Sequence, residues 1–183
     1  MPAILTRKTF VSTGVKAPPI DVTINTIFEQ SNKFYENQPS IFSPGIWPFA
    51  PNLVRKNLSG EEIDVILYDI PKKYLVAVFR VYFNTYQFSI NIADGDERNS
   101  CRHAYWIISM MQEFGEEITR KMANAHEIGR PGSHQDNCID AINNEASINY
   151  AMKNPHVHPA KGARGMWNRG LLVGSSYEGC KEK

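Results

Sequence analysis

The chain has 183 residues, of which 42% are hydrophobic and 21% charged, and its formal net charge is +1. This composition is ordinary for a soluble globular protein, and the length suits one domain whose core needs neither disulfides nor a metal to fold. A net charge so close to zero argues against a dominant surface for polyanions, so no nucleic-acid partner is indicated.

Cysteine usage and apolar runs indicate the compartment. Cys101, Cys138 and Cys180 lie far apart and form no C-x-x-C pair. Because their number is odd and their density low, we expect reduced thiols in a cytosol-compatible protein. The first residues lack a signal peptide's charged head and apolar run, and no apolar run approaches the roughly 20 residues that span a bilayer. We therefore expect synthesis in the cytoplasm without a cleaved signal, and no membrane span.

Residues 1–56 are predicted to form an N-terminal arm and an aromatic loop. The start of this region is polar and proline-containing, which is typical of an arm or an edge strand. Asp21 is a candidate N-cap for a following helix. Proline and glycine are frequent between residues 37 and 53, which predicts a long loop. We expect its aromatic residues to pack as a lid on the core: Phe42, Trp47 and Phe49.

Residues 57–152 are predicted to form a helical core domain. Ser59 and Glu62 have the spacing of a capping box, so a short helix should begin there and end before Pro71. From Leu75 to Ile90, apolar residues recur at helical spacing over several turns. The β-branched and aromatic content of this stretch would also suit a strand, but its length favours a helix.

Three further helices follow the turn-forming segment IADGDERN. They are predicted from about Ser100 to Phe114, from Glu116 to Glu127, and from about Gln135 to Met152. Gly115 lies near the end of the first of these helices. If the first two form an antiparallel hairpin, the start of one lies beside the end of the other.

Residues 153–183 are predicted to be a basic, irregular tail of the same domain. Six Lys or Arg residues face two acidic residues there, and Gly and Pro are frequent. One helical turn is expected around Met166 and Trp167. The basic side chains are expected to keep the tail soluble, or alternatively to bind anions at the site. The fold class is therefore mainly α, in a single helical domain.

Seven polar residues gather on the three consecutive helices. Asp140, Asn143 and Asn144 are spaced i, i+3, i+4 and so lie on one helix face. A hairpin of the two preceding helices would bring their polar residues to the same place. Polar groups buried there must satisfy one another or bind a ligand, because unpaired ones cost several kcal/mol. The predicted site consists of Arg102, His103, His126, Glu127, Asp140, Asn143 and Asn144.

Two interpretations of this site stay open. In the functional one, a divalent metal ion is held by His103, His126 and Asp140, with a position left for water. Glu127 would then be the general base, and Arg102 would hold an anionic group such as a phosphate, with Asn143 and Asn144 also binding substrate. In the structural one, a buried polar network locks the three helices together. The spacing matches no standard metal signature.

The strings RHAYW (102–106), AHE (125–127) and D-x-x-NN (140–144) resemble, in this order and spacing, an uncharacterised bacterial domain family. The resemblance covers about residues 70–152, with a weaker echo in GMWNRGLLVG (165–174). The glycine that follows the paired asparagines in the family is absent here, and Ser147 stands near its position. The family recurs as the C-terminal module of polymorphic toxins and of effectors delivered by contact-dependent systems, including type VI secretion.

The resemblance implies a secreted bacterial effector or toxin that enters a target cell. If it is an enzyme, hydrolysis at the centre formed by His103, His126, Glu127 and Asp140 is expected. The implied partners are a secretion-apparatus protein or a cognate immunity protein. The alternative is a non-catalytic virulence effector that binds a host or secretion-apparatus protein through residues 42–49 or the basic tail. A third interpretation is an immunity or adaptor protein of the same locus.

Overall fold

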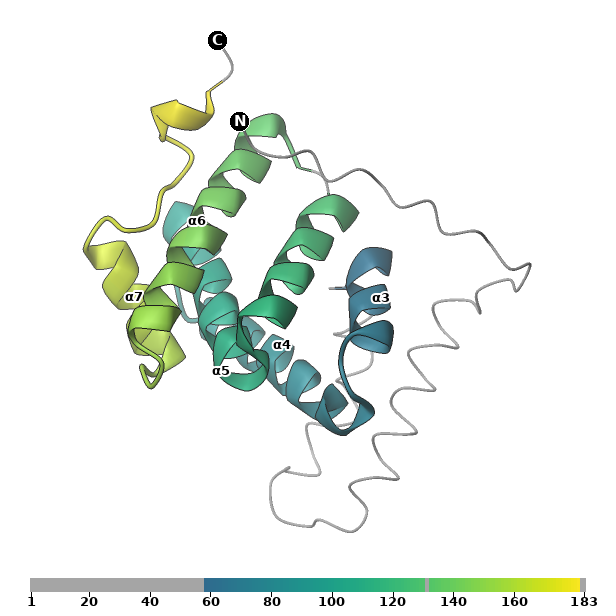
Figure 1. Ribbon diagram of the computed structural model, residues 1–183. Coiled ribbons are helices and arrows are strands. Elements are labelled where there is room, and N and C mark those ends of the chain that lie inside the picture. The colour runs from purple at the N-terminus through teal and green to yellow at the C-terminus, as the bar shows by residue number, and fades with distance from the viewer. Residues whose placement is uncertain (1–57, 131, 182–183) are drawn as a thin grey trace.

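The computed structural model describes residues 58–130 and 132–181. The predicted arm, the helix after Asp21 and the aromatic loop all lie outside these residues. Within them the chain is entirely helical, which confirms the predicted fold class (Figure 1). The elements in order are α3 (Gly60–Tyr68), η2 (Lys72–Tyr74), α4 (Leu75–Ser89), α5 (Asp96–Gly129), α6 (His134–Lys153), α7 (Pro159–Asn168) and η3 (Glu178–Cys180).

The helix α3 begins at the predicted capping box. The Ser59 hydroxyl accepts a hydrogen bond from the Glu62 amide at 3.1 Å, and the Glu62 carboxylate accepts one from the Ser59 amide at 2.7 Å. Two backbone donors of the first turn, which have no partner inside the helix, are thereby satisfied. The buried side chains of Ile63 and Ile66 attach α3 to the core.

The helix α5 is a hairpin of two arms joined at Gly115. Its backbone there has φ 77° and ψ −179°, a conformation that glycine adopts without the penalty paid by other residues. A straight helix would separate His103 from His126 by roughly 35 Å. Their ring centroids are instead 5.7 Å apart, so the second arm returns along the first. The predicted hairpin is confirmed, although its first arm begins at Asp96 rather than near Ser100.

The two arms of α5 form the centre of the domain and contact α3, α4, α6 and α7. One apolar cluster joins α5 to α3 and α4, and includes Ile66, Val78 and Ile107. A second cluster joins α5 to α7, and includes Ile108 and Met166. Burial of these two faces fixes both arms of the hairpin, and therefore the polar residues at its open end. None of the described helices is long and apolar enough to cross a membrane.

The C-terminal region is more regular than predicted. In place of a single turn, α7 extends over ten residues and packs against α5. Pro159 occupies its first turn, where the missing amide is not needed. The expected reduced state is wrong for two of the three cysteines, because Cys138 on α6 and Cys180 in η3 form a disulfide across 42 positions. Their spacing in sequence gave no indication that the tail returns to α6.

Candidate functional site

The open end of the α5 hairpin brings most of the predicted polar residues together. His103 lies on the first arm, His126 and Glu127 lie near the end of the second, and Asp140 and Asn144 lie on α6. These side chains form two groups, held by hydrogen bonds and by a close contact between His103 and Asp140. One contains His126, and the other contains Asp140, Asn144 and Glu127 around His103. The two imidazole rings meet edge to face, so the groups adjoin.

The first group is a histidine–carboxylate dyad. The Nδ1 atom of His126 lies 3.0 Å from Oε1 of Glu62. The carboxylate is fully buried, and the hydroxyl of Tyr82 donates to the same oxygen at 2.5 Å. An ionised carboxylate can only accept, so Nδ1 of a neutral His126 carries the proton and Nε2 carries the lone pair. In the described part of the chain, Nε2 of His126 has no hydrogen-bond partner.

The surroundings of Glu62 keep its side chain ionised. Burial alone would raise the pKa of this carboxyl group, but hydrogen bonds from His126, Tyr82 and the Ser59 amide hold the pKa below its ordinary value. Burial and the Glu62 charge raise the pKa of Tyr82 well above its ordinary value, so the phenol remains a donor. The sequence pattern predicts only a helix-capping role for Glu62. Nothing in a capping-box motif signals a second contact 64 residues away.

A cavity of about 310 Å³ opens beside the dyad. It is lined by His103, His126 and Arg102, three residues that were predicted to share one site. Arg98 and Arg130 also line the cavity. The sequence motifs do not indicate them, because Arg98 precedes the RHAYW string and Arg130 follows the AHE string. The lining is completed by Tyr82, Thr85, Tyr86, Ser89, Ile90, Arg98, Trp106 and Arg130. Three guanidinium groups and several aromatic rings therefore surround one small volume.

Trp106 contributes an unpaired donor to the cavity wall. Its indole ring lies near the rings of Tyr82 and His126, with centroid distances of 5.8 and 5.5 Å. The indole Nε1 atom is buried and is the one buried side-chain nitrogen or oxygen of the described residues that lacks a hydrogen-bond partner. A buried donor without a partner costs about 1–3 kcal/mol.

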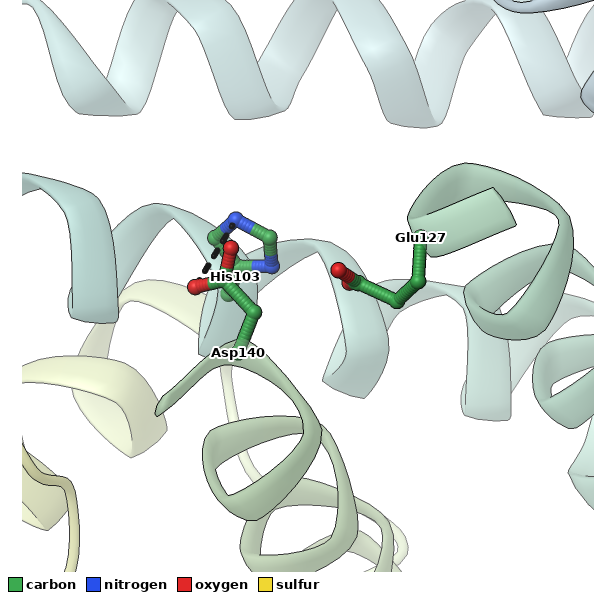
Figure 2. A group of neighbouring side chains, drawn as sticks. All are labelled: His103, Glu127 and Asp140. Atoms are coloured by element: carbon green, nitrogen blue, oxygen red, sulfur yellow. Dashed lines mark ion pairs between the residues drawn. The ribbon is translucent and has the colours of Figure 1, made fainter. Parts of the chain in front are cut away.

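The second group surrounds His103. Nε2 of His103 lies 3.6 Å from Oδ1 of Asp140, and Nδ1 lies 3.4 Å from Oδ1 of Asn144. The amide nitrogen of Asn144 donates to Oε1 of Glu127 at 3.0 Å. Figure 2 shows Asp140 and Glu127 extending from two different helices toward the His103 ring. One ligand atom from each of these three residues lies within 4.8 Å of the others.

This group differs in one member from the predicted metal set of His103, His126 and Asp140. The structure brings Glu127 together with His103 and Asp140, whereas His126 is not in this cluster and its Nδ1 atom contacts Glu62 instead. Glu127 is not among the residues that line the cavity.

Burial dominates the electrostatics of the second group. It lowers the pKa of His103 to about 3, helped by the positive charge of Arg102, so the imidazole is neutral. Burial also raises the pKa of Glu127 and of Asp140, and the negative charge of Asp140 raises that of Glu127 further. Two carboxyl groups and a neutral imidazole thus share a partly buried space.

The two remaining predicted residues have different positions. The Arg102 guanidinium donates to Oδ1 of Asn99 at 2.6 Å, and the Asn99 amide donates to Asp140, so Arg102 supports Asp140 indirectly. Asn143 is fully buried and lies outside both groups. Its amide bonds the backbone nitrogen and carbonyl of Val173 at 2.8 and 3.0 Å. Asn143 therefore attaches the C-terminal segment to α6 rather than facing the cavity.

The fold and the site define an all-helical domain with a polar centre at the open end of a helical hairpin. Residues 75–166 match the family described as a domain of unknown function, DUF6973, and the chain belongs to this family. The RHAYW, AHE and D-x-x-NN strings all lie within the matched residues, whereas Glu62 lies before them. No curated protein and no solved structure shows significant similarity to the chain.

Proposed function

We propose that this protein is a hydrolase, delivered as a secreted bacterial effector or toxin, that acts on a phosphate ester bound in the arginine-lined cavity. The observation that carries the proposal is the Glu62–His126 dyad, whose histidine lines the cavity. A histidine whose Nδ1–H is held by a carboxylate presents its other nitrogen as a base, which is the arrangement that hydrolases use to activate a nucleophile.

In the proposed reaction, His126 acts as the general base. Its Nε2 atom takes a proton from a water molecule while the water oxygen forms a bond to phosphorus. The ester P–O bond breaks, and the leaving oxygen receives the proton from His126. Glu62 is a positioning residue: it fixes the ring and stabilises the positive charge that His126 carries between the two proton transfers. Tyr82 and the Ser59 amide hold Glu62 in turn.

The charge of the cavity supports a substrate with a phosphate group. Arg98, Arg102 and Arg130 all line it, and guanidinium groups bind phosphate oxygens in a bidentate manner. The aromatic residues of the wall, Tyr86 and Trp106, supply an apolar surface for the rest of the ester. The chain as a whole is nearly neutral, so this concentration of positive charge is local rather than a general property of the surface.

Two observations support the proposal that the protein is exported as an effector. The three motifs resemble modules of polymorphic toxins and type VI secretion effectors. In addition, the Cys138–Cys180 disulfide is of a kind that persists mainly outside the reducing cytosol, which suits a protein that acts after export. A secretion-apparatus protein or a cognate immunity protein is the partner expected for such an effector.

The test measures hydrolysis and toxicity with the full chain. We expect release of nitrophenolate from p-nitrophenyl phosphate or bis(p-nitrophenyl) phosphate, and a loss of kcat on the order of 10²–10⁴ for His126→Ala and Glu62→Gln. His134→Ala, an exposed histidine on α6, is the matched control and should retain full activity. Turnover that survives both dyad variants, or no turnover of either ester, would contradict the proposal.

Expression of the protein in a sensitive bacterium distinguishes a catalytic effector from a non-catalytic one. Growth arrest by the wild-type chain should be relieved by the same two dyad variants, provided that circular dichroism shows them folded. Arrest that persists in folded His126→Ala would instead favour a binder that acts through another surface.

A further inference from the structure

We propose that His103, Asp140 and Glu127 form a binding site for one divalent transition-metal ion, such as Zn²⁺ or Mn²⁺. These residues come from both arms of α5 and from α6, and their side chains converge without belonging to the Glu62–His126 dyad (Figure 2). The proposal concerns ion binding and does not depend on the proposed hydrolysis.

The hydrogen bonds of Asn144 determine which nitrogen of His103 is available. A carboxylate accepts hydrogen bonds, so the amide nitrogen of Asn144 must face Glu127, and its oxygen must face Nδ1 of His103. Nδ1 of His103 therefore carries the proton. In the neutral, buried ring, the lone pair lies on Nε2, which is the nitrogen that faces Asp140.

A lone pair that faces a carboxylate oxygen requires a positive partner between them. Nε2 of His103 and Oδ1 of Asp140 are 3.6 Å apart, and Glu127 contributes a further oxygen within 4.8 Å. A single proton would satisfy one pair of these atoms and leave the other carboxylate unneutralised. A divalent ion would be shared by all three residues. Metal–ligand bonds of about 2.1 Å place neighbouring ligand atoms roughly 3.4 Å apart. The His103 and Asp140 atoms already have nearly this spacing, whereas the Glu127 oxygen would move closer to them.

The surroundings resemble the outer shell of a metal site. A ligating histidine usually donates its second ring nitrogen to an oxygen acceptor, and His103 does so to Asn144. Each carboxylate is itself held by an amide, Asp140 by Asn99 at 3.3 Å and Glu127 by Asn144 at 3.0 Å. A set of one imidazole and two carboxylates suits borderline ions rather than Ca²⁺, which prefers oxygen ligands alone.

Binding would have two consequences for the domain. The ion would join both arms of the α5 hairpin to α6 at the open end of the hairpin. It would also fix the His103 ring, which forms part of the cavity wall.

The experiment is calorimetric titration of the chelator-treated full chain with Zn²⁺ and, separately, with Mn²⁺. We expect one ion per chain for at least one metal, and a rise in Tm at saturating metal. Asp140→Asn and Glu127→Gln, which preserve side-chain shape, should each weaken binding at least tenfold. Glu117→Gln on the same helix is the matched control, and His126→Ala should also retain binding.

Three outcomes would overturn the proposal. They are no stoichiometric binding of either ion, unchanged affinity in both carboxylate variants, or loss of binding in His126→Ala with Glu127→Gln unaffected. Circular dichroism verifies that each variant is folded, and the two carboxylate variants test the site independently. Because the readout is ion binding, a protein that binds the ion but hydrolyses no ester would separate this inference from the proposed function.

Discussion

The carboxylate of Glu62, in the first turn of α3, holds Nδ1 of His126 at 3.0 Å, near the end of α5. One side chain thereby serves both as the helix cap, through the Ser59 amide, and as the partner of a cavity histidine. The start of α3 and the site are consequently coupled. Substitutions at the helix cap should therefore alter the position of the His126 ring.

Acid stability should report the ionised state of Glu62. Its pKa in the folded protein is below its ordinary value of 4.5, because the hydrogen bonds from His126, Tyr82 and the Ser59 amide outweigh the effect of burial. The folded state therefore binds fewer protons than the unfolded state, and the contribution of Glu62 to stability is complete above the ordinary pKa and lost as the pH falls through the lowered one.

Denaturant unfolding at neutral pH and at a pH of about 3 measures this contribution. The free energy of unfolding should fall less for Glu62→Gln than for the wild type over this interval. Glu61→Gln, which changes the exposed neighbouring residue, should follow the wild type. An equal fall in the free energy of unfolding in all three proteins would mean that the ionised Glu62 carboxylate does not stabilise the fold.

Gly129 should be essential for the contact between α5 and the α3 cap. A Cβ atom at this position would overlap the side chain of Ser59. We expect Gly129→Ala to destabilise the protein by about 1–3 kcal/mol, as overpacking does elsewhere, and to weaken the dyad. Gly60→Ala is the control, because a Cβ atom there meets nothing within 4 Å. Urea titration measures the free energy of unfolding of both variants. Equal values would contradict the close contact between Gly129 and Ser59.

Arg102 should act on substrate affinity more than on the chemical step. Its guanidinium lines the cavity, and a lost charge-assisted hydrogen bond costs about 1.5–3 kcal/mol, or roughly a 10- to 150-fold rise in KM. Steady-state kinetics of Arg102→Gln against a phosphate ester test this, with Arg169→Gln, at an exposed residue just after α7, as the control. A fall in kcat with an unchanged KM would assign Arg102 a different role.

The disulfide should contribute substantially to stability. Closing a loop of 42 residues restricts the unfolded chain, and such links typically contribute about 2–4 kcal/mol. Reductant should therefore lower the free energy of unfolding of the wild type. It should leave a Cys138→Ser/Cys180→Ser double variant unchanged, because the remaining Cys101 forms no link. A reductant effect of equal size in both proteins would exclude the disulfide as its cause.

Local signals in the sequence predicted much of the helical architecture. The Ser59–Glu62 spacing located the start of α3, and the period of apolar residues identified α4 despite its strand-like composition. Gly115 marked the turn of the α5 hairpin because a positive φ angle favours glycine. The length of α7 was not predicted, since its stability comes from packing on α5 rather than from strong local propensity.

The sequence by itself determined which helices carry the polar residues, and so predicted that His103 and His126 would meet. Only the tertiary structure decided their partners. Glu62 reaches His126, Glu127 joins His103 and Asp140, and Cys138 bonds Cys180 across long stretches of chain. The physical reason is that periodicity and caps depend on neighbours within a turn, whereas side-chain partners depend on how the buried faces of separate helices pack together.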